Sequence, residues 1–254
     1  MGAIDLHAKA SPTFEAKLAE TQKLLIRAAA DFGPITQASS LGAEDTVITH
    51  LINALELDIP VFVLDTGMLH TQTLELLERT KASSRAAVNV YQPVHESVVH
   101  FVKREGTDPM YRSIELRKAC CHIRKVEPLE RALAGKNAWI TGLRREQSNA
   151  RAEVPLMDAS DIPQSGRTKF NPLADWTWGD VWHYIKLNAV DYNPLHDEFY
   201  PSIGCAPCTR AISLGEDFRA GRWWWEDEAA KECGLHVKQE ESVLRQARDD
   251  RMTA

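Results

Sequence analysis

The sequence lacks a long hydrophobic run, and no stretch approaches the roughly 18 apolar residues that a membrane-spanning helix requires. Its first ten residues include Asp5 and lack both the basic start and the apolar centre of a secretory signal. It also has no excess of positive charge: the formal net charge is −6, whereas proteins that bind nucleic acids are usually basic. We therefore expect a cytoplasmic protein that binds neither membranes nor nucleic acids, in which a local cluster of cations holds any anion.

Cysteine is scarce, and its number is odd: five cysteines stand among 254 residues. A disulfide framework is disfavoured, because the expected compartment is reducing and an odd count leaves one thiol without a partner. Hydrophobic residues make up 44% and charged residues 26% of the chain, which is typical of a soluble globular enzyme. The length suits one large domain with a full core, and metal binding or catalysis explains the cysteines better.

Hydrophobic periodicity predicts alternating strands and helices over most of the chain. Helical spacing extends over residues 13–31, and Gly33-Pro34 then stops the element. Apolar strands are predicted at 59–67, 87–93 and 137–142. Further helices are predicted after the Ser/Gly-rich loop within 39–55, at 69–80, from Val94, at 175–187 and at 240–250, and the cysteine-bearing segment spans 113–133. The alternation indicates an α/β fold, a parallel sheet with helices on both faces.

Three polar segments follow the ends of predicted strands: SSLGAED at 39–45, LDTG at 64–67 and TGLRREQSNAR at 141–151. In parallel α/β sheets, ligands bind at the carboxyl ends of the strands. We therefore expect the three segments to converge on one pocket. From Asn193 onward the sequence is rich in Pro, Gly, Cys and Trp, which predicts a loop-rich C-terminal segment.

Four of the cysteines form two close pairs, Cys120-Cys121 and Cys205 with Cys208. A CxxC turn brings two thiolates within reach of one metal, and a second pair completes a four-sulfur site for zinc or an iron–sulfur cluster. Adjacent cysteines diverge from neighbouring positions of a helix, which suits a 4Fe-4S cube better than one zinc ion. Buried thiols that only pack are the alternative.

The fifth cysteine, Cys233, lies in the segment KECGLH and is left over from the two pairs. Arg219, Arg222 and His236 are near it in the sequence. Positive charge of this kind lowers the pKa of a thiol and makes it a better nucleophile. An inert cysteine close to a frayed terminus is the alternative.

Segment 39–45 has the composition of a phosphate-binding loop, because small residues let backbone N–H groups approach an anion at a helix N-terminus. It is not a Walker A sequence, since no Gly-Lys-Ser/Thr follows. Glu44 and Asp45 would repel excess negative charge near the loop, although they also leave room for a nucleotide with bound magnesium. An ordinary helix cap formed by Ser39 or Ser40 is the alternative.

Segment 141–151 concentrates arginines after the last predicted strand. Arg144, Arg145 and Arg151 carry planar guanidinium groups, which match the oxygens of sulfate or phosphate. A charged run is otherwise usually a solvated face, so this segment alone does not decide between an anion site and a surface.

Taken together and in this order, SSLGAED, LDTG, KACCHIRKVEPL, TGLRREQSNAR, GCAPCTR and KECGLH make the sequence resemble the assimilatory adenylylsulfate reductases of the phosphosulfate reductase family. The resemblance covers roughly residues 35–240, and the paired cysteines and ECGLH are its most specific parts. It implies an adenine-nucleotide α-hydrolase-like fold, related to the ATP pyrophosphatases. Residues 1–200 would form the nucleotide-binding domain, and residues 201–254 a C-terminal redox segment packed on it.

The resemblance also implies roles for individual residues. The ligands of a 4Fe-4S cluster would be Cys120, Cys121, Cys205 and Cys208. The catalytic group would be the nucleophile Cys233, the lysine between cluster and sulfate, Lys125, and the C-terminal Arg219, Arg222 and His236. The substrate would contact Ser39, Ser40, Gly42, Glu44, Asp45, Asp65, Thr66, Gly67, Arg144 and Arg151.

The activity implied by the resemblance is reduction of adenosine 5'-phosphosulfate to sulfite and AMP through a cysteine S-sulfonate. Thioredoxin or glutaredoxin would be the electron donor, and relatives of this kind are commonly homo-oligomers. The cluster would position Lys125 and adjust the local field, because the two thiols of thioredoxin already provide both electrons. A loop-rich C-terminal segment that closes over the substrate and opens to thioredoxin would serve both steps.

Three other functions stay open at this point. The first is the same chemistry on the 3'-phosphorylated substrate, either exclusively or in addition. The second is an ATP-dependent tRNA-thiolating enzyme, which would need an ATP-cleaving loop and a basic surface, and the net acidity disfavours it. The third is a metal-binding or redox-sensing module without catalysis, which would leave Cys233 and the arginine segment unexplained.

Overall fold

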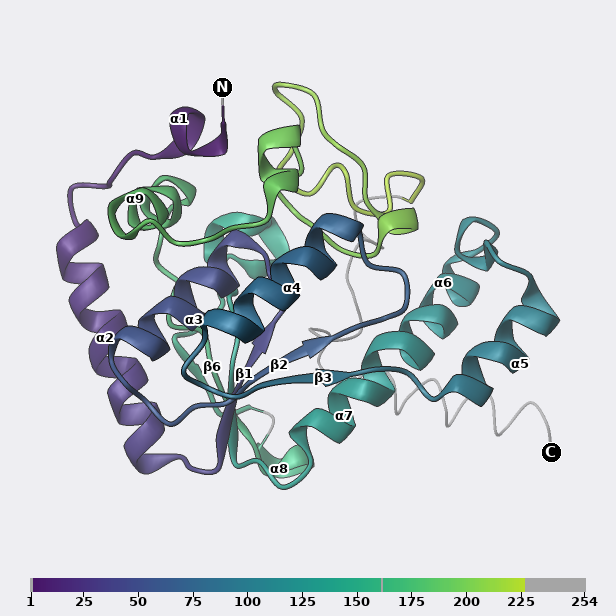
Figure 1. Ribbon diagram of the computed structural model, residues 1–254, viewed down its shortest axis with the longest axis horizontal. Helices are drawn as coiled ribbons and strands as arrows, with labels where there is room; N and C mark the ends of the chain where they lie inside the picture. The colour runs from purple at the N-terminus through teal and green to yellow at the C-terminus, as the bar shows by residue number, and fades with distance from the viewer. Residues whose placement is uncertain (1, 161, 227–254) are drawn as a thin grey trace.

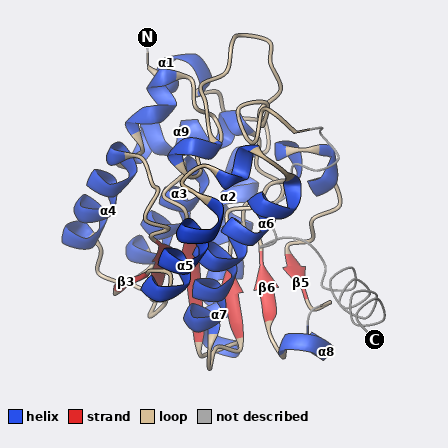
Figure 2. Cartoon of the chain, turned by 90° about the vertical axis from the view of Figure 1, so that its right-hand side faces the viewer, coloured by secondary structure: helices blue, strands red, loops and turns tan. Residues whose placement is uncertain are grey.

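Six short strands form one sheet in the order β3-β2-β1-β4-β6-β5. The computed structural model describes residues 2–160 and 162–226. The strands are β1 (Ile35–Ser39), β2 (Val61–Leu64), β3 (Val88–Tyr91), β4 (Ala138–Ile140), β5 (Met157–Asp158) and β6 (Thr168–Phe170). Neighbours pair in parallel except at the edge, where β5 runs antiparallel to β6 (Figure 2). The predicted α/β class is confirmed, and the antiparallel edge strand is an addition to it.

The helices before and between the strands match the predicted segments closely (Figure 1). The first half of the chain contains α1 (Ala3–His7), α2 (Phe14–Asp31), α3 (Ala43–Ala54), α4 (Thr71–Ser83) and α5 (His95–Glu105). The second half contains α6 (Ile114–Cys121), α7 (Glu127–Leu133), α8 (Ile162–Ser165) and α9 (Trp178–Asn188). Short 3₁₀ turns lie at Pro109–Tyr111, Arg145–Gln147, Asn149–Arg151, Pro194–Glu198 and Ala206–Cys208.

The sheet is covered on both faces, which explains why its central strands are apolar without alternation. Along β2, Phe62 packs with the α7 side chains, whereas its neighbour Val63 packs with Leu76 and Leu77 of α4. Successive side chains of a strand point to opposite faces, so both faces of β2 are buried. The main core lies between the sheet and helices α2, α3 and α9.

Asp180 on α9 ties the N-terminal part of the chain to the sheet domain. Its carboxylate accepts hydrogen bonds from the Lys17 amine at 2.8 Å and from the Ser11 backbone at 2.6 Å, and it caps its own helix through Thr177. Burial would raise the pKa of Asp180, but these hydrogen bonds outweigh it and lower the pKa to about 2. The ion pair with Lys17 therefore holds α2 against α9.

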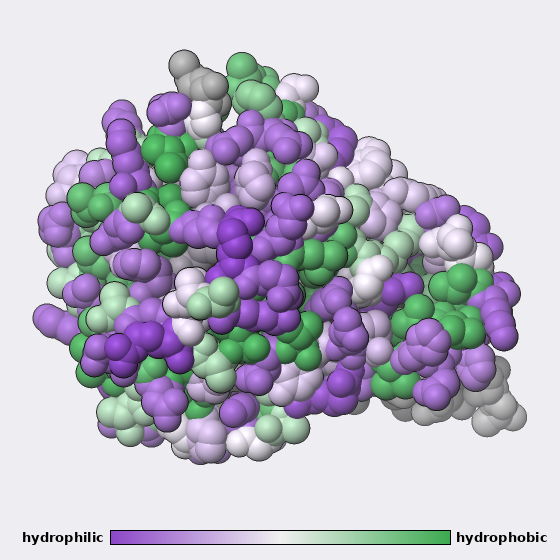
Figure 3. Space-filling view, in the orientation of Figure 1, coloured by the Kyte–Doolittle hydropathy of each residue, from purple (hydrophilic) through white to green (hydrophobic). Residues whose placement is uncertain are grey.

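Helices α5 and α6 project from the body as an arm, visible at the right of Figures 1 and 3. On the face shown in Figure 3, hydrophilic and hydrophobic residues are interspersed over both the body and the arm. The cysteine-bearing segment 113–133 contains α6 and α7, and a π-helical turn at His122–Val126 separates the two helices. Such wider turns are frequent at functional sites, and this one carries Arg124 and Lys125 directly after the paired cysteines.

Among the described helices and strands, five lie outside the predicted ranges: the short helices α1 and α8, the strand β1 before segment 39–45, and the strands β5 and β6. They are too short for a periodic pattern to indicate them. The predicted helix at 240–250 lies outside the described residues, as does most of segment 201–254, so the proposed division at residue 200 stays a prediction. Among the described helices, none is both long and apolar enough to cross a membrane.

Candidate active site

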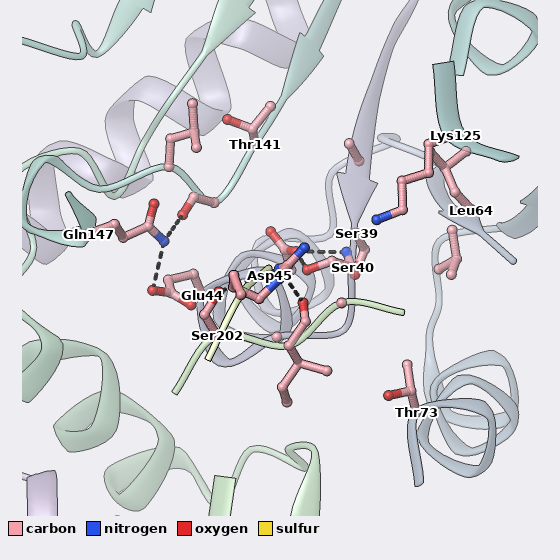
Figure 4. Close-up of a pocket in the computed structure, with 18 of the residues that line it drawn as sticks. Ser39, Ser40, Glu44, Asp45, Leu64, Thr73, Lys125, Thr141, Gln147 and Ser202 are labelled. Atoms are coloured by element: carbon pink, nitrogen blue, oxygen red, sulfur yellow. Dashed lines mark hydrogen bonds between the residues drawn. The ribbon is translucent and has the colours of Figure 1, made fainter. Parts of the chain in front are cut away.

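A cavity of about 220 Å³ opens at the carboxyl ends of β1, β2 and β4. It is lined by residues of all three polar segments that follow these strands, so their predicted convergence is confirmed. The predicted site residues that line it are Ser39, Ser40, Gly42, Glu44, Asp45, Thr66, Lys125, Arg151, Arg219 and Arg222. Figure 4 shows the loop serines, the carboxylates and Lys125 around this space.

Segment 39–45 forms a tight loop that starts helix α3 at Gly42. The turn requires Leu41 to take a left-handed conformation with φ of 60°, which is uncommon for a residue other than glycine. The Leu41 N–H donates to the Ser39 hydroxyl at 3.2 Å, which stabilises this conformation. The positive end of the α3 dipole therefore faces the cavity, as expected of an anion-binding loop.

The Asp45 carboxylate lies inside this loop and braces it. It accepts hydrogen bonds from the Ser40 N–H at 2.7 Å and from the Ser40 hydroxyl at 2.6 Å. A methyl group at Gly142 would come within 2.4 Å of an Asp45 oxygen, so only glycine fits there. Burial raises the pKa of Asp45 to about 6, even though the Ser40 hydrogen bonds act in the opposite direction. The charge beside the loop therefore changes near that pH.

The carboxylate of Glu44 is shielded from solvent and binds an arginine and an amide side chain. It accepts hydrogen bonds from Arg144 Nε at 2.9 Å and from Gln147 Nε2 at 3.0 Å (Figure 4 shows the latter). Arg144 is 1% exposed, pairs also with Glu146, and is not among the described residues that line the cavity. The sequence predicts Arg144 as an anion contact, whereas the geometry places it as the partner of Glu44.

Four cationic side chains line the cavity: Lys125, Arg151, Arg219 and Arg222. In Figure 4 the Lys125 amine points toward the Ser39–Ser40 side. Arg151 donates to Gln147 Oε1 at 2.6 Å, and Arg222 donates to the Ile203 carbonyl at 3.1 Å. The Nε of Arg222 is buried and has no hydrogen-bond partner among the described residues. A buried donor of this kind is costly unless an anion accepts its hydrogen bond.

Gly204 makes the position of Arg222 possible. A methyl group at Gly204 would lie 2.5 Å from Arg222 Nη2 and 2.6 Å from its Cζ. The guanidinium thus lies close beside residue 204, and its Cζ is 4.7 Å from the centre of the Trp223 ring. Motif spacing does not indicate this close approach.

The four paired cysteines are buried and line a second, smaller cavity beside the first. Lys125 and Trp223 line both cavities, so they separate the cysteines from the anion site. The Thr66 hydroxyl contacts Cys205 Sγ at 3.2 Å. Burial raises the pKa of Cys208 to about 12, with a further contribution from Cys205. Two pairs that are distant in the sequence therefore meet in one small space.

The donor set of this cavity is four buried cysteine sulfurs. Within the described residues, no three His, Cys, Asp or Glu side chains form a group that could hold one metal ion. A 4Fe-4S cube takes one thiolate at each of four separated irons, which suits four sulfurs spread around a cavity. Such burial disfavours thiolates unless positive charge compensates them, and bound iron would supply that charge.

His196 is a site residue that the sequence does not single out. Its Nε2 accepts the Ala43 N–H at the start of α3 at 3.2 Å, and its Nδ1 lies 2.8 Å from the Tyr200 carbonyl. These contacts require the neutral ring with the proton on Nδ1. Burial lowers the pKa of His196 to about 4. No motif indicates this residue, because its partner lies in a segment distant in the sequence.

Two other predicted substrate contacts lie outside the cavity lining. The Asp65 carboxylate accepts the Gly67 N–H at 3.0 Å and a hydrogen bond from Gln92 at 2.8 Å, so it closes the turn of the LDTG segment. Gly67 takes a left-handed φ of 69° in that turn. Cys233 and His236 lie outside the described residues, and their assigned roles stay predictions.

Fold and cavity define an α/β protein with a cation-lined cavity at the carboxyl ends of the parallel strands of its sheet. Residues 34–211 match the family model of the phosphoadenosine phosphosulfate reductase domain. The chain therefore belongs to this family, as the sequence resemblance predicts. The adenosine 5'-phosphosulfate reductases of Allochromatium vinosum and Burkholderia cepacia are 50% and 48% identical to it, over 90% and 89% of this chain and 87% and 90% of theirs.

One solved structure agrees with this assignment, and a second resembles the chain in fold. The phosphoadenylyl-sulfate reductase of Candida auris, solved as a phosphate complex, aligns with a TM-score of 0.64 and 29% identity, over 78% of this chain and 97% of its own. An FMN adenylyltransferase of Candida glabrata aligns with a TM-score of 0.56 at 13% identity, over 95% of this chain and 85% of its own. The second likeness concerns the fold alone.

Proposed function

We propose that this chain reduces adenosine 5'-phosphosulfate to sulfite and AMP in sulfate assimilation. The observation that carries the proposal is the shared wall of the two cavities: Lys125 lines both the anion site and the cysteine cavity. The names of relatives at about 50% identity support the same substrate. The α3 N-terminus suits the phosphate, on which negative charge develops as AMP leaves, and the cations suit the negatively charged sulfate.

The chemistry begins with a thiolate at Cys233. Its sulfur attacks the sulfate sulfur, a sulfur–sulfur bond forms, and the bond from sulfur to the bridging oxygen breaks. AMP leaves with the electron pair, and an S-sulfonate stays on Cys233. Thiolate and sulfate are both negative, so Lys125, Arg219 and Arg222 lower the barrier by compensating their charges, each by a few kcal/mol on the scale of about 100- to 1000-fold in rate.

The second step needs two electrons, which a dithiol of the thioredoxin or glutaredoxin class supplies. One thiolate of that partner attacks the Cys233 sulfur, and sulfite leaves with the electron pair of the broken sulfur–sulfur bond. The partner's second thiolate then resolves the mixed disulfide and restores Cys233. The sulfur is thereby reduced, and the partner's dithiol becomes a disulfide.

Cys120, Cys121, Cys205 and Cys208 would hold a 4Fe-4S cluster, which supplies a nearby charge centre rather than the electrons of the reaction. Lys125 stands in the wall between that position and the anion site. Its role is to bring a positive charge to the sulfate from the cysteine side. A Cys121→Ser enzyme that lost iron and kept its turnover would contradict a role for the cluster in this positioning.

The experiment that tests the proposal measures thioredoxin-dependent sulfite release by anaerobically purified protein. Adenosine 5'-phosphosulfate and its 3'-phosphorylated form are compared at equal, limiting concentration, with Cys233→Ser as the control. A strong preference for the first substrate is expected, and Cys233→Ser should release no sulfite. Comparable rates would indicate a dual-substrate reductase. No sulfite from either substrate, with iron retained, would contradict the proposal and favour ATP-dependent thiolation.

A further inference from the structure

A buried ion pair joins the cysteine-bearing helix to the last described residue of the C-terminal segment. Arg117 on α6 donates from Nε to Glu226 Oε1 at 2.8 Å and from Nη2 to Oε2 at 2.7 Å. The two side chains are 0% and 3% exposed. Burial would lower the pKa of Arg117, but the hydrogen bonds and charge of Glu226 outweigh it and raise that pKa. Cys121, one helical turn after Arg117, contributes in the same direction.

Trp223 completes this junction. The Arg117 guanidinium lies 4.6 Å from the centre of its ring, and Arg222 lies 4.7 Å from it, so two cations contact one indole. Trp223 takes a left-handed conformation with φ of 43°, a strained state that persists only where the surroundings hold it. The backbone N–H of Trp223 donates to the Cys208 carbonyl at 3.2 Å, and the backbone carbonyl of Trp223 accepts the Glu226 N–H at 2.8 Å.

The position of Glu226 is therefore defined relative to both cysteine pairs. One connection runs through the side chain of Arg117 to α6, which ends at Cys121. The other runs through the backbone of Trp223 to Cys208. A buried ion pair is a poor choice for stability alone, because an apolar pair of the same volume is often as stable or more so. What the bidentate pair adds is a single defined geometry.

Cys233 follows Glu226 by seven residues, a length that reaches at most about 25 Å from the pair. Any error in where the chain leaves Glu226 is carried forward to that thiol. We propose that the Arg117–Glu226 pair positions the start of the C-terminal segment, so that helix α6 and its cysteines set where Cys233 meets the sulfate. Arg117 and Glu226 are positioning residues in this proposal, which rests on the proposed function.

The test uses the full-length, anaerobically purified protein and one turnover without thioredoxin. Three single variants, Glu226→Gln, Arg117→Glu and Glu226→Arg, are compared with the charge-swapped double variant Arg117→Glu/Glu226→Arg. The control is Glu216→Gln, because Glu216 forms a two-bond pair with Arg210 in the same segment but in an exposed place. Mass spectrometry follows S-sulfonate formation on Cys233, calorimetry gives AMP affinity, and visible absorbance reports the iron content.

We expect each single variant to slow sulfonation of Cys233 by about 10- to 100-fold, the scale of a small misplacement of reacting groups. AMP affinity should stay within about threefold, because AMP does not need the thiol. The charge-swapped variant should recover about tenfold of the lost sulfonation rate. Such a recovery would show that the two residues act as a pair, because separate structural roles of the two residues would not produce it. Glu216→Gln should behave as the wild type.

Two results would overturn the positioning role. The first is sulfonation by Glu226→Gln at the rate of Glu216→Gln. The second is an equal loss of AMP affinity, iron and sulfonation in all single variants with no recovery in the swapped pair, which would assign the pair to folding alone. A wild type that forms no S-sulfonate on Cys233 would instead contradict the proposed function, so the two failures are distinguishable.

Discussion

This molecule has two buried arginine–glutamate pairs near its candidate site, and they differ in what they connect. Arg144 and Glu44 join the loop after β4 to the start of α3, both part of the sheet domain. Arg117 and Glu226 join the arm to the irregular C-terminal segment. The first pair joins the loop after a strand to the start of a helix, whereas the second ends on a residue outside any helix or strand. Breaking the first pair should therefore disturb the sheet domain itself, whereas breaking the second should disturb the course of the C-terminal segment.

The sharpest test of this contrast is removal of Arg144. An Arg144→Met variant leaves Glu44 buried without its cation, and we expect the free energy of unfolding to fall by about 3–5 kcal/mol. Urea denaturation of the protein measures it. Arg131→Met is the control, because Arg131 forms an exposed pair with Glu127 and its loss should cost less than about 1 kcal/mol.

Glu226→Gln should differ from Arg144→Met in the same measurement. Local separation of Glu226 from α6 would let water reach Arg117, so the free energy of global unfolding should change by less than for Arg144→Met. Equal losses in the two variants would break the distinction between a stabilising pair and a positioning pair.

The next largest effect on stability is expected at His196, whose ring contacts both Ala43 at the start of α3 and the Tyr200 carbonyl. His196→Leu removes the acceptor of the Ala43 N–H, which should cost about 1–3 kcal/mol and weaken AMP binding. Because the folded pKa of about 4 lies below the usual 6.5, the wild type should gain stability as pH rises from 4 to 6.5 and keep it above. Denaturation at pH 4.5 and 7 tests this, and a flat difference between wild type and His196→Leu would contradict it.

Gly204→Ala tests the position of Arg222, which lies in the C-terminal segment. The added methyl group would displace the Arg222 guanidinium, and we expect kcat/KM for adenosine 5'-phosphosulfate to fall by about tenfold or more, with little change in AMP affinity. Gly33→Ala serves as the control, since a methyl there meets only the Ala29 carbonyl oxygen at 4.0 Å. Unchanged sulfite release in Gly204→Ala would show that Arg222 does not need its present position.

The smallest effect concerns the charge on Asp45. Its folded pKa of about 6 lies above the usual value, so the carboxyl becomes negative beside the loop as pH rises through 6. AMP affinity should therefore decrease severalfold between pH 5 and 7.5, after allowance for the second ionisation of its phosphate. In Asp45→Asn this decrease should shrink, as calorimetry at the two pH values would show. A decrease of the same size in both proteins would exclude Asp45 as its source.

Much of the fold follows from local patterns. Residues 13–31 predict helix, and α2 spans Phe14–Asp31, because periodicity and the Gly33-Pro34 stop agree. Strand β2 is also predicted from local sequence, since both its faces are buried and its apolar run is continuous. The π-helical turn at His122–Val126 is invisible to a helical pattern, because inserting one extra residue per turn leaves the composition unchanged.

The site residues also fall into two groups: those that local motifs predict and those that only the structure shows. The loop serines, Lys125, Arg151, Arg219 and Arg222 are predicted from motifs, and the structure brings them to one cavity. Arg144 is predicted there too, but its burial against Glu44 depends on a contact across a hundred residues. His196 and Gly204 matter only because distant chain segments approach them. No local signal can report such contacts.

By itself the sequence determined which residue types are available and which elements form, because helix periods, strand runs and cysteine spacing are local properties. It also determined the family, through six motifs in a defined order. Only the tertiary structure decided which cations face the cavity and which form ion pairs with buried carboxylates. It also placed Lys125 and Trp223 between the two cavities. The physical reason is that burial and charge compensation depend on what packs nearby, and packing joins residues that the chain keeps far apart.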